Sequence, residues 1–77
     1  MDIIAIILSN AERETSKTKL MYSANLSFDH FQSYLVFLLE RGLLETTDKQ
    51  GQVLIKTTNT GADFLRLYRM IENMLNK

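Results

Sequence analysis

The chain has 77 residues, the size of a single small domain. It contains no cysteine and only one histidine, which excludes a disulfide and leaves too few ligands for a zinc site. Nine lysines and arginines balance nine aspartates and glutamates, so the chain lacks the overall basic excess that is typical of proteins that neutralise DNA phosphates.

The first segment is an apolar run at residues 3–8. It is too short to cross a bilayer, which takes about 20 residues, and it follows an aspartate instead of a basic leader. We therefore expect a soluble cytoplasmic protein. The spacing of the isoleucines and Leu8 favours one face of a helix, predicted here over residues 2–13 with Asp2 at its start. Residues 14–16 then form a polar connection, in which Thr15 or Ser16 caps the next helix.

The most informative segment is KTKLMYSANLS, at residues 17–27. It predicts a short helix at 18–24, a break at Asn25 and Leu26, and a serine, Ser27, that caps a second helix. This order is the helix-turn-helix pattern, in which the second helix enters the major groove of DNA. Tyr22 is expected to pack in the core.

The second helix of the pattern is predicted from Ser27 to Gly42, a residue suited to a positive φ angle. Its core stripe consists of Phe31, Tyr34, Leu35 and Leu38. Val36 and Phe37 lie off that stripe. We expect them to contact the first or the last helix, and a dimer contact is the alternative.

Two strands and a helix complete the chain. Residues 43–47 and 52–57 are rich in β-branched side chains and flank a polar turn at 48–51, which predicts a hairpin. Thr58 is expected to cap a helix that ends near Asn76. Apolar residues near its end extend beyond a core of this size and would be exposed on a monomer. We expect a partner's equivalent helix to bury them, and a frayed tail is the alternative. The expected dimer residues are Phe64, Tyr68, Ile71, Met74 and Leu75.

The order of these elements and two motifs resemble the archaeal winged-helix DNA-binding family, which includes small chromatin proteins and single-domain transcriptional regulators. One motif is residues 17–27 with the helix that follows. The other is T-x-x-G-x-x-F-L, which begins at Thr58 and ends at Leu65. The resemblance implies a mainly α fold with a small β-hairpin, in the order helix–helix–helix–strand–strand–helix. It covers one domain, 1–77, with residues 58–76 forming a dimerisation helix.

The resemblance also implies binding of double-stranded DNA as a homodimer, without a cofactor. Lys17 and Lys19 would hold phosphates, while the front of the second motif helix reads bases and the hairpin, the "wing", touches the backbone. Gln32 is the best base reader, since its amide can pair with adenine. The expected DNA-contacting residues are Lys17, Lys19, Ser27, Phe28, Asp29, His30, Gln32, Ser33, Lys49 and Gln50.

Other functions are weighed against this one. The neutral charge, the acid at Asp29 and the surplus apolar Val36 and Phe37 favour a winged helix that binds a protein and has weak or no DNA binding. A module that only dimerises, with its activity in a partner chain, is a third possibility. An enzyme is not expected, because the chain has no cysteine nucleophile, no glycine-rich phosphate loop and one histidine on a surface helix.

Overall fold

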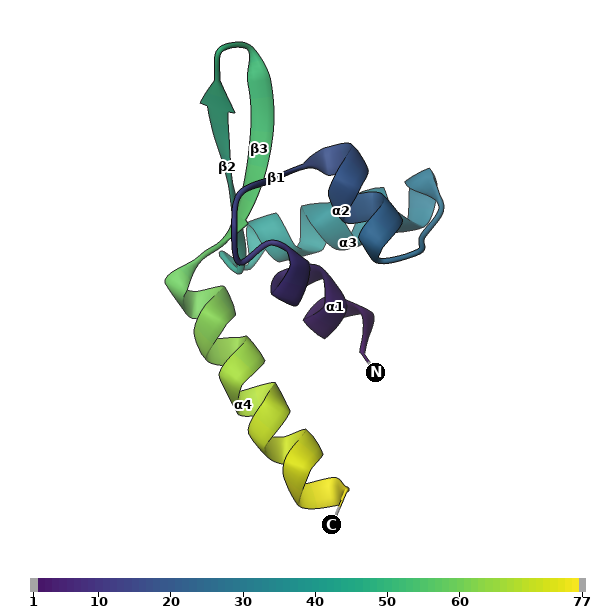
Figure 1. Cartoon of the computed structure of the whole chain (residues 1–77), viewed down its shortest axis with the longest axis vertical. Coiled ribbons are helices and arrows are strands. Elements are labelled where there is room, and N and C mark those ends of the chain that lie inside the picture. Colours follow the sequence, from purple (N-terminus) through teal and green to yellow (C-terminus); the bar gives the residue numbers. More distant parts are fainter. Residues whose placement is uncertain (1, 77) are drawn as a thin grey trace.

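The computed structural model describes residues 2–76. Helix α1 spans Ile3–Asn10 and is followed by the two-residue strand β1, Thr15–Ser16. Helices α2, Lys17–Ser23, and α3, Phe28–Glu40, form the helix-turn-helix. Figure 1 shows the rest of the chain extending from this body in two directions, the hairpin on one side and the last helix on the other. These parts are β2, Leu44–Lys49, β3, Gln52–Thr57, and α4, Asn59–Leu75.

The predicted mixture of helices and a hairpin is confirmed, with two corrections to its order and bounds. The polar connection before α2 contains strand β1, which pairs antiparallel with β3 and makes a sheet of order β1-β3-β2. Helix α1 ends at Asn10, short of the predicted 13, because the backbone turns at Ala11. The carbonyl of Ala11 then accepts a hydrogen bond of 2.8 Å from the backbone N–H of Thr57, which ties this turn to the end of β3.

The core lies where α1, α2 and α3 meet the base of the sheet. Phe31, Leu35 and Leu38 of α3 are buried as predicted, while Tyr34 is half-buried. The sheet contributes Leu44 and Ile55 to the core. The pairing register places both side chains on the same face of the sheet, because alternate residues of a strand share a face. The buried apolar cluster is Ala5, Ile7, Leu8, Ala11, Leu20, Ala24, Phe31, Leu35, Leu38, Leu44, Ile55 and Leu65.

Three aromatic or branched side chains lie outside this core, against expectation. Tyr22 is 72% exposed, because the short helix α2 buries only Leu20 and its far side faces solvent. Val36 and Phe37 are 43% and 42% exposed on α3, so neither belongs to the buried core. Their role in a dimer contact stays a prediction.

Local hydrogen bonds set where the elements end. Gly42 has a φ of 71° after α3, and the backbone N–H of Leu43 donates to the carbonyl of Leu38 at 2.9 Å, which closes the helix in a Schellman motif. In the hairpin turn Gln50 and Gly51 have φ values of 54° and 81°, as in a two-residue type I′ turn. The hairpin is thus tight, and β2 runs two residues further than predicted.

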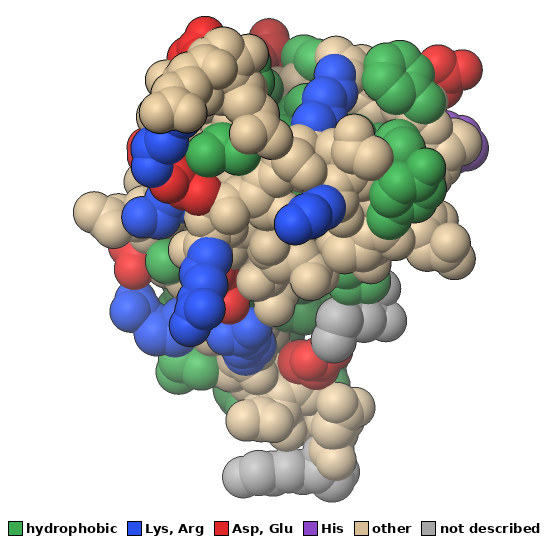
Figure 2. Space-filling view, turned by 45° about the horizontal axis from the view of Figure 1, so that its top comes forward, with side chains coloured by type: hydrophobic (Ala, Val, Ile, Leu, Met, Phe, Trp, Pro, Cys, Tyr) green, Lys and Arg blue, Asp and Glu red, His purple; other side chains and the backbone are tan. Residues whose placement is uncertain are grey.

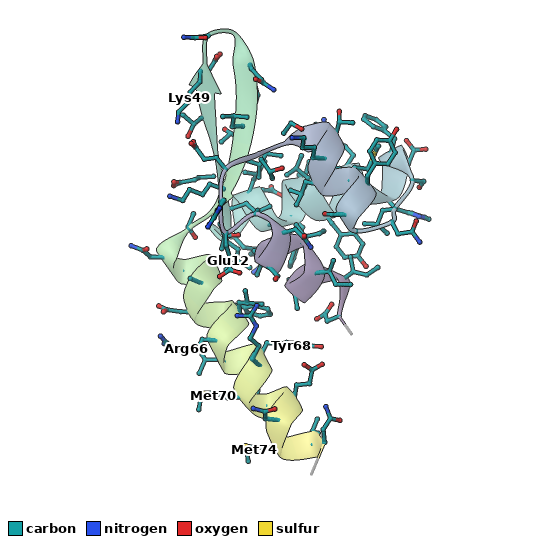
Figure 3. All side chains as sticks on the ribbon, viewed as in Figure 1. Glu12, Lys49, Arg66, Tyr68, Met70 and Met74 are labelled. Atoms are coloured by element: carbon teal, nitrogen blue, oxygen red, sulfur yellow. The ribbon has the colours of Figure 1, made fainter. Side chains whose placement is uncertain are left out.

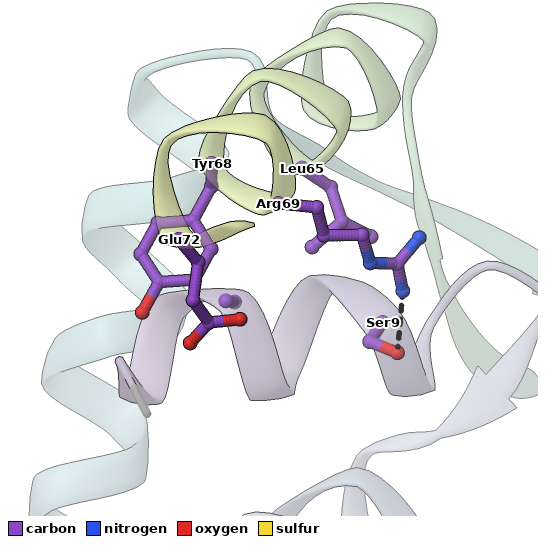
Figure 4. A pocket seen from close by; sticks show the side chains of 6 residues that line it. Ser9, Leu65, Tyr68, Arg69 and Glu72 are labelled. Carbon is purple, nitrogen blue, oxygen red and sulfur yellow. Dashed lines mark hydrogen bonds between the residues drawn. The ribbon is translucent and has the colours of Figure 1, made fainter. Parts of the chain in front are cut away.

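The inner face of helix α4 lies along α1 from Leu65 to Glu72. Leu65 is buried there, and the backbone N–H of Asp2 donates to the Tyr68 hydroxyl at 3.0 Å. A small pocket of about 70 Å³ remains between α1 and α4. Figure 4 shows Arg69 reaching across it to the Ser9 hydroxyl, at 3.3 Å. No helix within residues 2–76 is both long enough and apolar enough to cross a membrane.

Candidate nucleic-acid interface

The helix-turn-helix is built by two serine caps. The Ser16 hydroxyl accepts a hydrogen bond from the Lys19 backbone N–H at 3.2 Å and starts α2. The Ser27 hydroxyl accepts from the His30 backbone N–H at 3.4 Å and starts α3. Between the helices Asn25 has a φ of 55°, the left-handed conformation that asparagine tolerates better than most residues. These local bonds confirm the predicted helix starts and break.

The two lysines of the motif lie at the first turn of α2. Lys19 is exposed and Lys17 is half-buried, and neither forms an ion pair with another residue of the described range 2–76. The Lys17 ammonium lies 5.2 Å from the centre of the Phe28 ring, at the start of α3. This contact brings the first turn of α2 and the first turn of α3 together on one surface.

The exposed side of α3 combines polar and apolar side chains and carries little charge. Asp29 is exposed in the first turn, where its negative charge interacts favourably with the positive end of the helix dipole. No lysine or arginine occurs between Phe28 and Glu40. The Ser33 hydroxyl is engaged with the Asp29 carbonyl at 3.2 Å. Gln32 is half-buried, and its carbonyl oxygen is buried without a hydrogen-bond partner in the described chain. Because this oxygen has almost no accessible surface, an outside donor can reach it only if the Gln32 side chain turns outward.

Lys49, the predicted contact of the wing, is paired with an acidic residue, unlike the two lysines of α2. Lys49 pairs across the ladder with Gln52, so it lies on the sheet face opposite to the one that carries buried Ile55. Its ammonium lies 2.7 Å from a Glu14 carboxylate oxygen. This hydrogen bond is the main cause that lowers the pKa of Glu14. Gln50 is exposed in the turn beside it.

The surface charge of this side is mixed. Figure 2 shows lysine and arginine side chains gathered toward one side of the visible face with acidic side chains among them, and apolar side chains at the upper edge on the other side. Of the basic residues, Lys49, Arg66 and Arg69 pair with Glu14, Asp63 and Glu12 in that order. Three basic residues are thus paired, whereas five others form no ion pair within residues 2–76: Arg13, Lys17, Lys19, Arg41 and Lys56.

A second exposed surface lies on the side of α3 that faces α1. Ile4, Ser33, Tyr34 and Phe37 line a shallow hollow of about 330 Å³. The Arg41 guanidinium lies 5.0 Å from the centre of the Phe37 ring at its border. Ser33, a predicted base contact, thus belongs to this side as much as to the front of α3.

The last helix has two faces. Tyr68, predicted at a dimer interface, lies on the inner face against α1, where its hydroxyl binds the Asp2 backbone. Figure 3 shows Met70 and Met74 extending from the other side of α4, away from α1. The overhang predicted for the last turns is confirmed, since Met74 is 75% exposed and its neighbours are comparable. The exposed apolar residues of α4 are Phe64, Leu67, Met70, Ile71, Met74 and Leu75.

Leu67 was missed by the sequence reasoning. With Phe64, Ile71 and Met74 it completes a spacing of three, four and three residues, the a/d pattern of a coiled-coil seam. The signal was present in the sequence but was obscured by Leu65 and Tyr68, which belong to the inner face. We call the four residues Phe64, Leu67, Ile71 and Met74 the outer seam.

Comparison with known proteins agrees with this geometry. A family model described as winged helix-turn-helix matches residues 1–76. The uncharacterized protein MJ0287 of Methanocaldococcus jannaschii is 33% identical over 67 residues, which cover 86% of this chain and 65% of that protein. Another uncharacterized protein of the same organism, MJ0290, is 38% identical over 48 residues, 62% of this chain and 23% of that protein. The chain thus aligns with less than two thirds of either relative.

A solved structure shares the fold. The crystal structure of Sso10a-2, a DNA-binding protein from Sulfolobus solfataricus, aligns with a TM-score of 0.77 over 96% of this chain and 82% of that one. The sequence identity is 23%, so this likeness concerns the arrangement of helices and strands.

Proposed function

The chain belongs to the winged helix-turn-helix family, and from this premise we propose that it binds double-stranded DNA through α3. The observation that carries the proposal is the surface formed by the first turns of α2 and α3. Lys17 and Lys19 stand there without ion pairs inside the described range, beside the exposed front of α3. A solved structural neighbour described as a DNA-binding protein supports the same reading.

In this proposal the two lysines anchor phosphates and α3 enters the major groove. The residues available for base edges are Phe28, Asp29, Gln32 and Ser33, with His30 at the margin and Ser27 holding the helix start near the backbone. The Gln32 carbonyl oxygen is buried without a partner, so base reading requires this side chain to turn outward, where a base amine completes its hydrogen bonds.

The wing contributes a weaker contact. Gln50 and the turn backbone reach the DNA first, whereas Lys49 is held by Glu14 on the outer face of the sheet. Lys49 contacts a phosphate only when that phosphate takes the place of the Glu14 carboxylate. The number of phosphates held per protomer is therefore small, and two protomers are needed for useful affinity.

We further propose that the protein acts as a homodimer through α4. The outer seam holds four large apolar side chains, all exposed within residues 2–76, on the face of α4 opposite to the one that packs against α1. Packing two seams together places two α3 helices in one assembly, as expected of a small transcriptional regulator or a chromatin-associated protein. Such a protein resides in the cytoplasm on the nucleoid.

The test is the loss of DNA binding when the α2 lysines are removed. Lys17→Ala and Lys19→Ala should each weaken binding to a labelled duplex and reduce the slope of log affinity against log salt by about 0.9. Arg66→Ala is the matched control, because it removes one positive charge from α4, where Arg66 is paired with Asp63. Unchanged binding in both lysine variants would contradict the proposal.

A second function is favoured by one specific observation. Val36 and Phe37 are exposed on α3, and Phe37 lines the apolar hollow beside Ile4. A winged helix whose α3 binds a protein instead of DNA would need such a surface. Under this alternative the two lysine variants keep the partner interaction, and Phe37→Ser abolishes it in a pull-down from cell extract.

A further inference from the structure

One large aromatic side chain stands at the front of the proposed DNA-binding surface. Phe28 is the first residue of α3, and its side chain is 58% exposed. A residue of this size gains stability by burial, yet more than half of its surface is accessible within the described chain. The exposed ring is therefore available for contact with a ligand.

A contact with Lys17 covers part of the ring. The Lys17 ammonium lies over it, 5.2 Å from its centre, in a cation–π arrangement. Lys17 is also a proposed phosphate anchor. A phosphate held by this lysine would bring the sugar–phosphate backbone close to Phe28 and leave the uncovered part of the ring toward the adjoining bases.

The neighbours of Phe28 on α3 limit what the helix can read. Gln32 follows four residues later, so the two side chains are neighbours on one face, about 6 Å apart. The usual reader of guanine is an arginine or lysine that pairs with its O6 and N7 atoms, and the range Phe28–Glu40 contains neither residue. An apolar ring and a carboxamide remain.

These two groups match three of the four features that an A·T pair presents in the major groove. Once its side chain turns outward, the carboxamide of Gln32 can pair with the N6 and N7 atoms of adenine, while an apolar ring contacts the C5-methyl group of thymine. Bases on one strand are about 3.4 Å apart along the axis, so neighbours about 6 Å apart on α3 reach base pairs one or two steps from each other.

We propose, building on the DNA-binding function above, that Phe28 contacts the C5-methyl group of thymine and makes α3 selective for A·T pairs. The contact is apolar, so it adds discrimination without adding charge. Salt weakens the phosphate anchoring by Lys17 and Lys19 but leaves the preference for the methyl group unchanged.

The test removes only the methyl groups. Two labelled A·T-rich duplexes of about 30 base pairs are compared, identical except that deoxyuridine replaces every thymidine in one. The wild-type protein should bind the thymine duplex about fourfold more tightly for each methyl group contacted. The ratio of the two affinities should be the same at low salt and at a higher salt concentration.

Substitutions test whether Phe28 causes the ratio of affinities for the two duplexes. Phe28→Ala should bind both duplexes equally, whereas Phe28→Leu keeps an apolar group and should retain part of the ratio. Tyr22→Ala is the matched control, because Tyr22 is a more exposed aromatic residue of the same motif that lies on α2. Circular dichroism checks that each variant keeps its helices, as expected for changes at exposed positions.

The outcomes are distinct. Equal binding of both duplexes by the wild type, an unchanged ratio in Phe28→Ala, or an equal loss of the ratio in Tyr22→Ala would overturn the role of Phe28 while DNA binding stands. If neither duplex binds at low salt, the proposed function fails together with this inference.

Discussion

At the scale of single residues, side-chain oxygen atoms organise this chain. Ser16, Ser27 and Thr58 each accept a hydrogen bond from the backbone N–H three residues later and so fix the starts of α2, α3 and α4. These bonds are local, which is why the sequence predicted the caps at Ser27 and Thr58 and limited the remaining one to Thr15 or Ser16. Replacing such a cap by alanine typically costs about 1 kcal/mol.

The pair of Glu14 and Lys49 is also a residue-scale feature, but its partners are far apart in the chain. Glu14 precedes β1 and Lys49 ends β2, and they meet because both strands pair with β3. The sequence predicted Lys49 as a free wing contact, since nothing local shows that the short segment at 15–16 joins the sheet. Its pairing depends on a strand that lies some forty residues later.

The Glu14 carboxylate gives a prediction about pH. Its pKa is lowered below the ordinary value of 4.5, mainly by the hydrogen bond from Lys49. The stabilisation is therefore complete above pH 4.5 and is lost as the pH falls through the lowered pKa. Urea unfolding of the wild type and Glu14→Gln should differ at neutral pH, and the difference should shrink in acid. Glu40→Gln, at an exposed position without an ion pair in the described range, should show no such change. A difference that persists at low pH would contradict the role of the pair.

At the scale of elements, the junction between α3 and α4 explains the T-x-x-G motif. The Thr58 hydroxyl donates to the carbonyl of Gly42 at 2.6 Å and accepts from the Gly61 N–H at 3.0 Å, so one side chain joins both helix ends. Gly61 packs directly against the carbonyl of Leu43, and a Cβ atom there would overlap that oxygen and lie 2.7 Å from the Thr57 methyl group. The motif thus encodes a close approach of two backbones.

This junction gives the second prediction. Gly61→Ala should destabilise the protein by about 1–3 kcal/mol, although alanine is the better helix former, because the backbone of Leu43 must move to admit the methyl group. The free energy of unfolding in urea measures the effect. Thr60→Ala, at an exposed position of the same helical turn, is the control and should change stability little. A stabilised Gly61→Ala variant would show that the close approach is absent.

The elements that sequence reasoning predicted well are those with local signals. Residues close together in the sequence determine the caps, the positive φ at Gly42 and the apolar stripe of α3. The failures concern neighbours in space. Tyr22 was expected in the core, but a helix as short as α2 offers only a narrow buried face. Likewise the exposure of Phe37 depends on how α1 and α3 cross, which spacing within α3 does not determine.

At the scale of the whole molecule, α4 carries apolar side chains on two different faces. Its inner face holds Leu65 and Tyr68 against α1, and its outer seam is exposed together with the last turns. The sequence predicts the overhang. It also led us to expect Tyr68 in the dimer and gave no role to Leu67, because the apolar residues of the two faces alternate along one helix and their spacing alone does not separate them. A small domain with so much apolar surface on one helix gains stability from a partner.

The third prediction is that the outer seam sets the oligomeric state. Ile71→Asp should give a monomer by analytical ultracentrifugation at concentrations where the wild type is a dimer, because a carboxylate in a seam has no partner there. The wild-type unfolding midpoint should also rise with protein concentration, and that dependence should vanish in the variant. Asn73→Asp introduces the same charge at another exposed position of α4, away from the seam, and should remain a dimer. A monomeric wild type would contradict the assignment.

The most direct test of the account as a whole is the binding of wild-type protein to a labelled random-sequence duplex of about 30 base pairs, followed by fluorescence anisotropy as salt rises. Anchoring by a few phosphates predicts binding at low salt that weakens along a straight line on a log–log plot, with a slope of about −3 per protomer. No binding at low salt, or binding that does not respond to salt, would contradict the electrostatic anchoring on which the proposed function rests.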